Sequence, residues 1–351
     1  MKKLVLFSII VLGISSCKND LDLNADYKEI PVVYGILNQN DSIHYVKITK
    51  AFLGEGNANN MAMVRDSSEY PDGVLKVTLK EENIGNPRTI DLKRIEITNK
   101  ESGNFYSPNQ YVYAIKNSEL SGTKKLNISA RYKLTVENLS TGNIAEATTM
   151  LIDNGQLNIA NRLPSLSFYN NSTKEISSPQ IRINGAIGAE RHSGEMIIEI
   201  LEIKLAAPFD TIVKKIKFKN EGLRKPNINI SEEIIWTIGG DVIISEIIKA
   251  LPVDESIERF IGKVYFTTYA ASEDLDIFMS ANEPSNGLVQ DKPVFTNLSN
   301  GLGIFASRTY SNKQIYVNAN SAKYLKDTYP NRNFTKFWNE NGAVGNYSLI
   351  Q

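Results

Sequence analysis

Residues 30–52 read IPVVYGILNQNDSIHYVKITKAF, and this stretch decides the fold. Its first part, Pro31 to Leu37, is an apolar run, and its last part, Ser42 to Phe52, alternates between apolar and polar residues. The residues between them, Asn38 to Asp41, are polar and favour a turn. The stretch therefore predicts two β-strands joined by a polar turn.

The same period of two continues beyond this pair. Val74 to Leu79 alternates cleanly, whereas Gly54 to Pro71 is rich in Gly and Asn and is interpreted as a long loop. Further short strands are predicted at residues 90–97, 111–115, 132–136 and 145–152. Seven strands separated by Gly, Asn and Pro turns predict an immunoglobulin- or fibronectin-like β-sandwich domain over residues 28–155. A parallel α/β fold is disfavoured because no amphipathic helix lies between the strands.

A polar stretch between Asp153 and Pro179 marks the expected boundary to a second domain at residues 156–351. Strands are predicted in it at residues 181–187, 195–205, 211–218 and 263–267. Two short helices are also predicted, Val242 to Leu251 with Asp241 as N-cap and Ser272 to Met279 with Ser272 as N-cap. The fold class expected for the whole chain is mostly β, a sandwich domain followed by a second β-rich domain with a few short helices.

Three patterns in the second half invite a functional interpretation. Acidic residues gather at the start of the second helix, at Glu273, Asp274 and Asp276. They suit the helix dipole, and a calcium loop would also need a turn glycine and a distal Glu. Asn300 to Gly303 resembles a phosphate loop only in its glycines, since no Lys-Ser/Thr and no helix follow. We therefore expect no metal, and a structural turn at Asn300 to Gly303 from which Leu302, Ile304 and Phe305 enter a strand.

The third pattern is a run of lysines in the predicted strand 211–218 and just after it. Lys215, Lys217 and Lys219 would share one face of an extended strand. One interpretation is a patch for anionic glycans or phospholipid headgroups. The favoured interpretation is an edge strand that lysines protect from pairing with another chain.

The N-terminus carries the features of an export signal. Lys2 and Lys3 precede an apolar run from Leu4 to Ile14, which small residues and Cys17 follow. Eleven apolar residues are too few for a membrane span of about 20, so residues 1–16 are predicted to be a cleaved signal peptide. Cys17 is the only cysteine in 351 residues, so the exported chain has no cysteine pair for a disulfide.

Ile14-Ser15-Ser16-Cys17 resembles the lipobox of bacterial lipoproteins. The resemblance implies a mature chain that begins at Cys17, with a diacylglyceryl group on its thiol and a further acyl chain on its amine. Residues 17–27 are then a tether between lipid and first domain. Within the tether, Lys18, Asn19 and Asp20 resemble the export signal of surface-exposed lipoproteins of Bacteroidota. A solvated tether with no signalling role is the alternative.

The lipobox, the strand pair at 30–52 and the stretch from Asn297 to Phe305 together resemble uncharacterised outer-membrane lipoproteins of Bacteroidota, which often accompany TonB-dependent receptors. The resemblance implies a lipid-anchored outer-membrane protein, facing the cell exterior, with an outer-membrane β-barrel protein as partner. The expected function is a non-catalytic accessory or structural subunit. The alternative is an adhesive or glycan- or peptide-binding protein that uses loops such as Gly54 to Pro71 and Gly103 to Gln110. Its possible stacking surfaces are Tyr34, Tyr45, Tyr70, Tyr106 and Tyr111, for most of which a place in the core or in a strand ladder is the favoured interpretation.

Enzyme classes find little support in the sequence. The only histidines are His44, in an alternating strand, and His192, in a predicted turn. No Gly-x-Ser-x-Gly motif and no zinc ligand set accompany them, although a glycosidase carboxylate pair stays open. Without Lys2 and Lys3, the 39 basic residues fall to 37 against 39 acidic residues, so nucleic acid is not an expected partner. We expect no enzyme and no cofactor.

Overall fold

The computed structural model describes residues 29–51, 57–98, 100–153, 155, 157–160, 163–206, 210–224, 227, 229–283, 294–339 and 342–344. Strands make up 48% and helices 16% of the chain, which confirms the mostly β class. The predicted signal peptide, the tether at 17–27 and the residues Cys17, Lys18, Asn19 and Asp20 lie outside the described residues.

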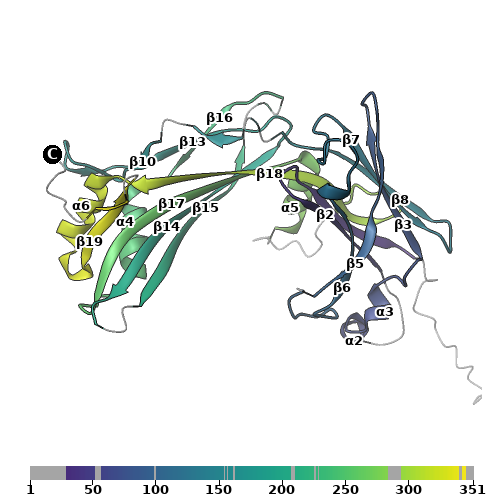
Figure 1. The fold of residues 1–351 in the computed structure, drawn as a ribbon, viewed down its shortest axis with the longest axis horizontal. Helices are drawn as coiled ribbons and strands as arrows, with labels where there is room; N and C mark the ends of the chain where they lie inside the picture. The colour runs from purple at the N-terminus through teal and green to yellow at the C-terminus, as the bar shows by residue number, and fades with distance from the viewer. Residues whose placement is uncertain are drawn as a thin grey trace, which may run out of the picture.

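The first domain is a sandwich of two antiparallel sheets (Figure 1). The first sheet contains, in spatial order, β1 (Pro31–Leu37), β2 (Ile43–Lys50), β6 (Gln110–Lys116) and β5 (Lys93–Ile97). The second contains β4 (Thr89–Asp91), β3 (Leu75–Glu82), β7 (Arg131–Asn138) and β8 (Ile144–Met150). The predicted strand pair at 30–52 is confirmed as β1 and β2, with Pro31 opposite Lys50. Buried side chains of both sheets, such as Val33 and Leu134, form one core.

The order of the eight strands matches the A-B-E-D and C-F-G sheets of immunoglobulin-like sandwiches, with β4 as an added strand. A second feature of that fold is a tyrosine near the start of one strand that bonds the backbone a few residues upstream. Tyr132 has this place in β7: its hydroxyl accepts from the amide of Asn127 at 2.6 Å and donates to Glu81 at 3.0 Å. Assignment to the immunoglobulin family stays a prediction.

Two segments of this domain differ from the prediction. Residues 90–97 form two strands, because Leu92 is buried in the core where the chain crosses from the second sheet to the first. The predicted loop at 54–71 contains two short helices, α2 (Ala58–Ala62) and α3 (Arg65–Ser68). Asn57 caps α2 by accepting from the amide of Asn59 at 2.8 Å. A third short helix, η1 (Asn117–Glu119), follows β6.

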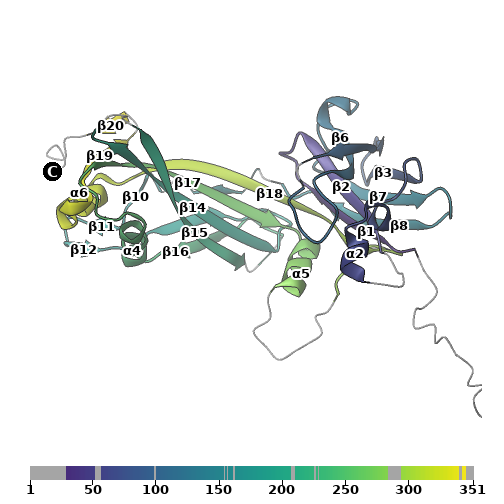
Figure 2. The same ribbon diagram turned by 90° about the horizontal axis from the view of Figure 1, so that it is seen from below.

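The second domain is built on four long antiparallel strands that Figures 1 and 2 show side by side: β14 (Arg191–Lys204), β15 (Thr211–Arg224), β17 (Ile257–Ala271) and β18 (Leu302–Val317). One face of this sheet is packed. The elements that pack on it or flank it are β9 (Asn158–Ile159), β10 (Ser165–Leu166), β11 (Tyr169–Asn170), β12 (Glu175–Ile176), β13 (Gln180–Asn184), β16 (Glu233–Thr237), β19 (Phe334–Asn339), β20 (Gly342–Val344), α4 (Gly240–Ala250), α6 (Ala319–Thr328) and η2 (Pro330–Arg332). The core between them includes Ile198, Phe266, Trp236 and Ile243.

Both predicted helices exist, with one correction to their starts. Gly239 is the N-cap of α4, and Asp241 lies inside its first turn. Ser272 is the N-cap of α5 (Glu273–Asn282), as predicted. The Ser272 hydroxyl does not cap the helix but accepts from the amide of Ser307 at 3.4 Å.

Strand β18 joins the two domains into one sheet. Residues 302–307 pair in parallel with β1, and residues 308–316 pair antiparallel with β17. Phe305 is fully buried in the core of the first sandwich, although it belongs to the range predicted for the second domain. The predicted turn at Asn300 to Gly303 is the entry to this pairing. Gly303 has a φ of +103°, and a Cβ there would lie 2.0 Å from the carbonyl oxygen of Val33, so only glycine fits.

Candidate binding face

The four long strands of the second domain have one face that no described element covers along most of its length. We call it the open face. It consists of the outward-pointing side chains, those that alternate with the buried core residues Met196, Phe266 and Ile315. Its members are Ser193, Glu195, Ile197 and Glu199 of β14, Lys215, Lys217 and Lys219 of β15, Lys263, Tyr265, Thr267 and Tyr269 of β17, and Tyr310, Asn312, Gln314 and Tyr316 of β18.

Strand register sets these side chains in rows across the sheet. Tyr310 lies opposite Tyr269, and their ring centroids are 6.5 Å apart. Gln314 lies opposite Tyr265, which in turn lies opposite Ile197. The tyrosines are half-buried, except for Tyr269, which is 38% exposed. Flat aromatic rings are thus flanked by amide and hydroxyl groups on a broad surface.

Lysines on β15 face glutamates on β14. Lys215 lies 3.8 Å from Glu199, and Lys219 lies 3.7 Å from Glu195. Partial burial of Tyr265, together with the Glu199 carboxylate, raises the pKa of its phenol, so this ring stays neutral at physiological pH. The structure places β15 at the edge of the sheet, as the favoured interpretation of the lysine run requires, and puts the three lysines on one face.

Helix α5 closes one end of the open face, at the bend between the domains. Its Leu275 packs with Ala271, Ile304 and Ala306 in a small apolar cluster of the described residues. The other side of the helix is held to the sheet by ion pairs between Asp276 and two arginines.

Asp276 is the centre of that charged contact. It accepts from the Arg191 Nε at 2.7 Å and from the Arg224 Nη2 at 2.8 Å. Burial alone would raise the pKa of the Asp276 carboxyl, but the hydrogen bonds and charges of Arg224 and Arg191 lower it overall. Asp276 therefore ties α5 to β14 and β15, a role that the helix-dipole interpretation of the acidic run missed.

The other acidic residues of that run do not join Asp276 in a metal site. Asp274 accepts from the Asn297 amide at 3.0 Å. Within the described parts of the chain, no group of three His, Cys, Asp or Glu side chains could hold a metal ion.

Both histidines are buried, and neither belongs to the open face. His44 is 2% exposed, its Nε2 lies 2.9 Å from the Asn117 side-chain oxygen, and burial lowers its pKa. His192 is buried in β14 rather than in a turn, and its Nε2 accepts from the Ala186 amide at 3.1 Å. The Ser193-Gly194 pair that suggested a turn lies in the strand. Glycine is required there for packing, since a Cβ on Gly194 would lie 2.6 Å from the Trp236 ring.

Of the tyrosines near the predicted ligand loops, Tyr34 and Tyr45 are 46% and 42% exposed. Tyr70 is buried, and Tyr111 lies between the guanidinium groups of Arg65 and Arg94, at 4.0 Å and 3.4 Å from its ring centroid. The tyrosines of the open face were not singled out from the sequence. Tyr265 and Tyr269 lie four residues apart in an alternating stretch, so they share one face of a strand. This spacing is the signal that could have found them.

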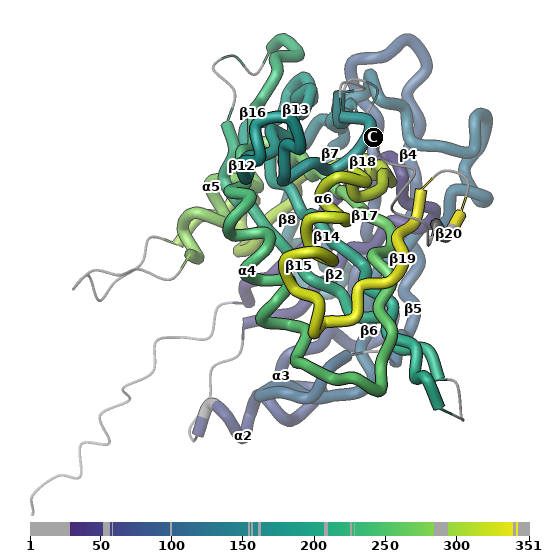
Figure 3. Tube along the Cα trace, turned by 90° about the vertical axis from the view of Figure 1, so that its left-hand side faces the viewer, coloured from purple at the N-terminus to yellow at the C-terminus, as the bar shows by residue number. Residues whose placement is uncertain are grey.

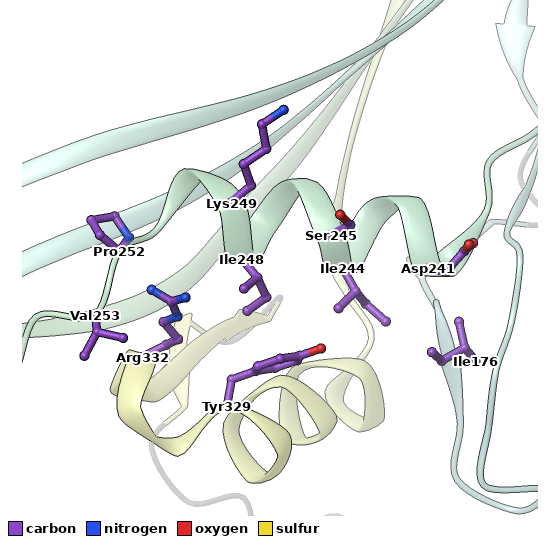
Figure 4. A pocket seen from close by; sticks show the side chains of 10 residues that line it. All are labelled: Ile176, Asp241, Ile244, Ser245, Ile248, Lys249, Pro252, Val253, Tyr329 and Arg332. Carbon is purple, nitrogen blue, oxygen red and sulfur yellow. The ribbon is translucent and has the colours of Figure 1, made fainter.

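Two concave regions lie elsewhere on the described surface. A groove of about 760 Å³ lies outside α4, where Ile244 and Ile248 point toward Tyr329 (Figure 4). A cleft of about 590 Å³ lies between the domains, with Arg131 and Thr148 on one side and the start of α5 on the other. Arg131 donates to the Thr148 hydroxyl at 2.8 Å.

Comparison with known proteins adds no assignment. No family model matches the chain, and no curated protein matches it. In the described residues, no helix has the length and apolar character that a membrane crossing needs.

Proposed function

We propose that this chain is an outer-membrane lipoprotein that acts as a non-catalytic accessory subunit of a complex with a β-barrel protein. Cys17 is the lipid attachment site, and Lys18, Asn19 and Asp20 direct the chain to the cell exterior. The open face is the surface that contacts the partner. The proposal combines the features of the N-terminal sequence with the chemistry of that face.

The observation that carries the proposal is the tyrosine content of the open face. A solvated face is ordinary in an antiparallel sheet, so exposure alone says little. Tyrosine is enriched at protein interfaces because its ring gives a large contact area and loses little conformational entropy on binding. The face carries four lysines and two glutamates, and two of the lysines are paired with the glutamates, which keeps its net charge at +2. Such a surface suits a protein partner better than a polyanion.

Gentle purification of the acylated protein from native membranes tests this function. The wild type should bring a stoichiometric β-barrel protein with it, and the double variant Tyr269→Ser with Tyr310→Ser should lose that partner. Ile235→Ser is the matched control, because Ile235 is exposed to a similar degree but lies on β16, on the other side of the sheet. Purification of the wild type without a partner would contradict the proposal.

Display at the cell surface has a test of its own. Protease added to intact cells should digest the wild type, whereas a variant with Asp20 and Asp22 both changed to Ala should be protected. Protection of the wild type in cells whose integrity is verified would place the protein on the inner side of the membrane.

The same tyrosines favour glycan binding as a second candidate. Sugar rings stack their C–H faces on aromatic rings, and amides such as Asn312 and Gln314 can bond their hydroxyls. Isothermal titration of the purified chain with a panel of polysaccharides separates the two functions. Binding that the Tyr269→Ser, Tyr310→Ser variant loses would favour the glycan function over the accessory subunit.

A further inference from the structure

The outer end of the β14–β15 hairpin carries a cluster of exposed apolar side chains, which we call the hairpin patch. It consists of Leu205, Ile212, Val213 and Val253, which are 55%, 45%, 47% and 52% exposed. Strand register places Val213 opposite Leu201, and the amide of Leu205 donates to the carbonyl of Ser256 at 2.8 Å. The loop with Val253 therefore lies beside the hairpin end. Four exposed apolar side chains from three segments thus lie at one tip of the molecule, with Ile212 and Val213 on opposite faces of β15.

A second cluster, the helix patch, lies at the end of the first sandwich. Met63 and Val64 follow α2 and are 58% and 53% exposed, and Phe105 is 51% exposed. The backbone amide of Tyr106 donates to the carbonyl of Ala62 at 3.1 Å, which holds the loop with Phe105 against the helix. The two patches belong to different domains, and both consist of exposed apolar side chains.

Both patches lie on one side of the molecule. Figures 1 and 3, which are views at right angles, place the outer end of the β14–β15 hairpin and helix α2 at the lower edge. The beginning of the described chain lies at the same end of the sandwich as α2. The amide of Ala51, on the segment that leads into α2, donates to the carbonyl of Ile30 at 2.9 Å.

The lipid anchor limits how far this side can be from a membrane. The first described residue is residue 29. The segment before it that begins with Cys17, residues 17–28, has twelve residues. A chain of that length spans at most about 40 Å when fully extended. The end of the sandwich that carries the helix patch is thus kept within reach of the bilayer in the anchored protein.

We propose that the hairpin patch and the helix patch rest on the phospholipid surface, so that the anchored protein contacts the bilayer at two places besides its lipid. The inference rests on the proposed lipid anchoring at Cys17. Apolar side chains at the headgroup boundary gain free energy by leaving water. At the hairpin patch charge contributes little, because Lys204 is paired with Asp210 at 3.2 Å. The contact should therefore persist at high salt.

Fluorescent labelling of the acylated full-length protein in vesicles tests this contact. Acylation consumes the only native thiol, so Val213→Cys and Met63→Cys each introduce a single site for an environment-sensitive dye. Ile235→Cys is the control, since Ile235 is 46% exposed but lies outside both patches. The vesicles contain phosphatidylethanolamine and phosphatidylglycerol, with or without a lipid that carries a nitroxide at its headgroup.

The labels at Val213 and Met63 should show a blue-shifted emission, gain quenching by the nitroxide lipid and lose quenching by iodide, at low and at high salt. The label at Ile235 should show none of these changes. If the acylated protein floats with the vesicles but all three labels behave alike, the two-patch contact is wrong and the lipid anchor stands. If the protein does not float with the vesicles, the anchor fails and the inference fails with it.

Discussion

Phe305 lies opposite Gly35 in the parallel pair of β18 and β1, and its ring occupies the space that a side chain at residue 35 would need. A Cβ on Gly35 would be 2.9 Å from Phe305 Cδ2 and 3.2 Å from Val46 Cγ2. A residue near the end of the chain thus completes the core that the first strand begins. The two domains are coupled through this contact.

Gly35→Ala should destabilise the protein. The added methyl group has no space between Phe305 and Val46, and overpacking of a core costs about 1–3 kcal/mol. Chemical denaturation followed by circular dichroism measures the loss in the free energy of unfolding. Gly85→Ala is the control, because no heavy atom lies within 4 Å of its Cβ position. Equal stability of the two variants would contradict the close packing at Gly35.

Fragment 28–155 should not fold stably alone, although it spans the sandwich domain predicted from the sequence. It lacks Phe305 and Leu298, and loss of a buried Phe side chain alone costs about 3–5 kcal/mol of the about 5–15 kcal/mol that stabilise a typical domain. Adding residues 294–308 through a flexible linker should restore cooperative unfolding. A cooperative transition of the same midpoint in fragment 28–155 alone would show that β18 is not needed.

Asp276→Asn should lower stability at neutral pH by about 2 kcal/mol, because it removes the carboxylate that Arg191 and Arg224 share and leaves the buried Arg191 guanidinium with Glu283 as its ion-pair partner. The arginines lower the pKa of Asp276 in the folded protein below its ordinary value of 3.8. The unfolded chain therefore binds a proton first, and the stabilisation by Asp276 is complete above that value and is lost as the pH falls below it.

Denaturation of the wild type and of Asp276→Asn at several pH values checks this sign. The difference in stability between them should be constant at neutral pH and should shrink below about pH 4. A difference that grows as the pH falls would mean that the carboxylate is not stabilised by Arg191 and Arg224.

Cys17→Ala should abolish membrane anchoring. The variant should accumulate as a soluble or an uncleaved form, because acylation needs the thiol and two or more acyl chains are what hold a lipoprotein stably in a bilayer. Fractionation with a carbonate wash measures the outcome. A variant that is cleaved and still resists the wash would show that the lipobox interpretation is wrong.

The sequence predicted those elements whose signal is local. The apolar run at 31–37 and the alternation in residues 42–52 and 74–79 are enough to find β1, β2 and β3, because one face of each strand is buried in the same core. Residues 302–317 were predicted only as the start of a strand. Their pairing with β1, some 270 positions earlier, depends on Gly303 and Phe305 meeting Val33 and Gly35, and no period in the sequence identifies that partner.

The candidate site was predicted less well than the fold, for a related reason. The open face exists only when Tyr265 and Tyr269 of one strand stand beside Gln314 and Tyr310 of another, and strand register creates that surface. The lysine run was visible because it lies within a single strand. The structure places β15 at the sheet edge, as predicted from this run, since lysines on an edge strand oppose the addition of further strands.

Crosslinking in living cells is the sharpest test of the proposed contact between the open face and an outer-membrane partner. A photoreactive phenylalanine analogue placed at Tyr269, and at Ile235 as the control, is activated in intact cells, and the adducts are identified by mass spectrometry. We expect one dominant adduct at Tyr269, with an integral β-barrel protein, and no such adduct at Ile235. The account is contradicted if Tyr269 gives no protein adduct, or if both positions give the same adducts.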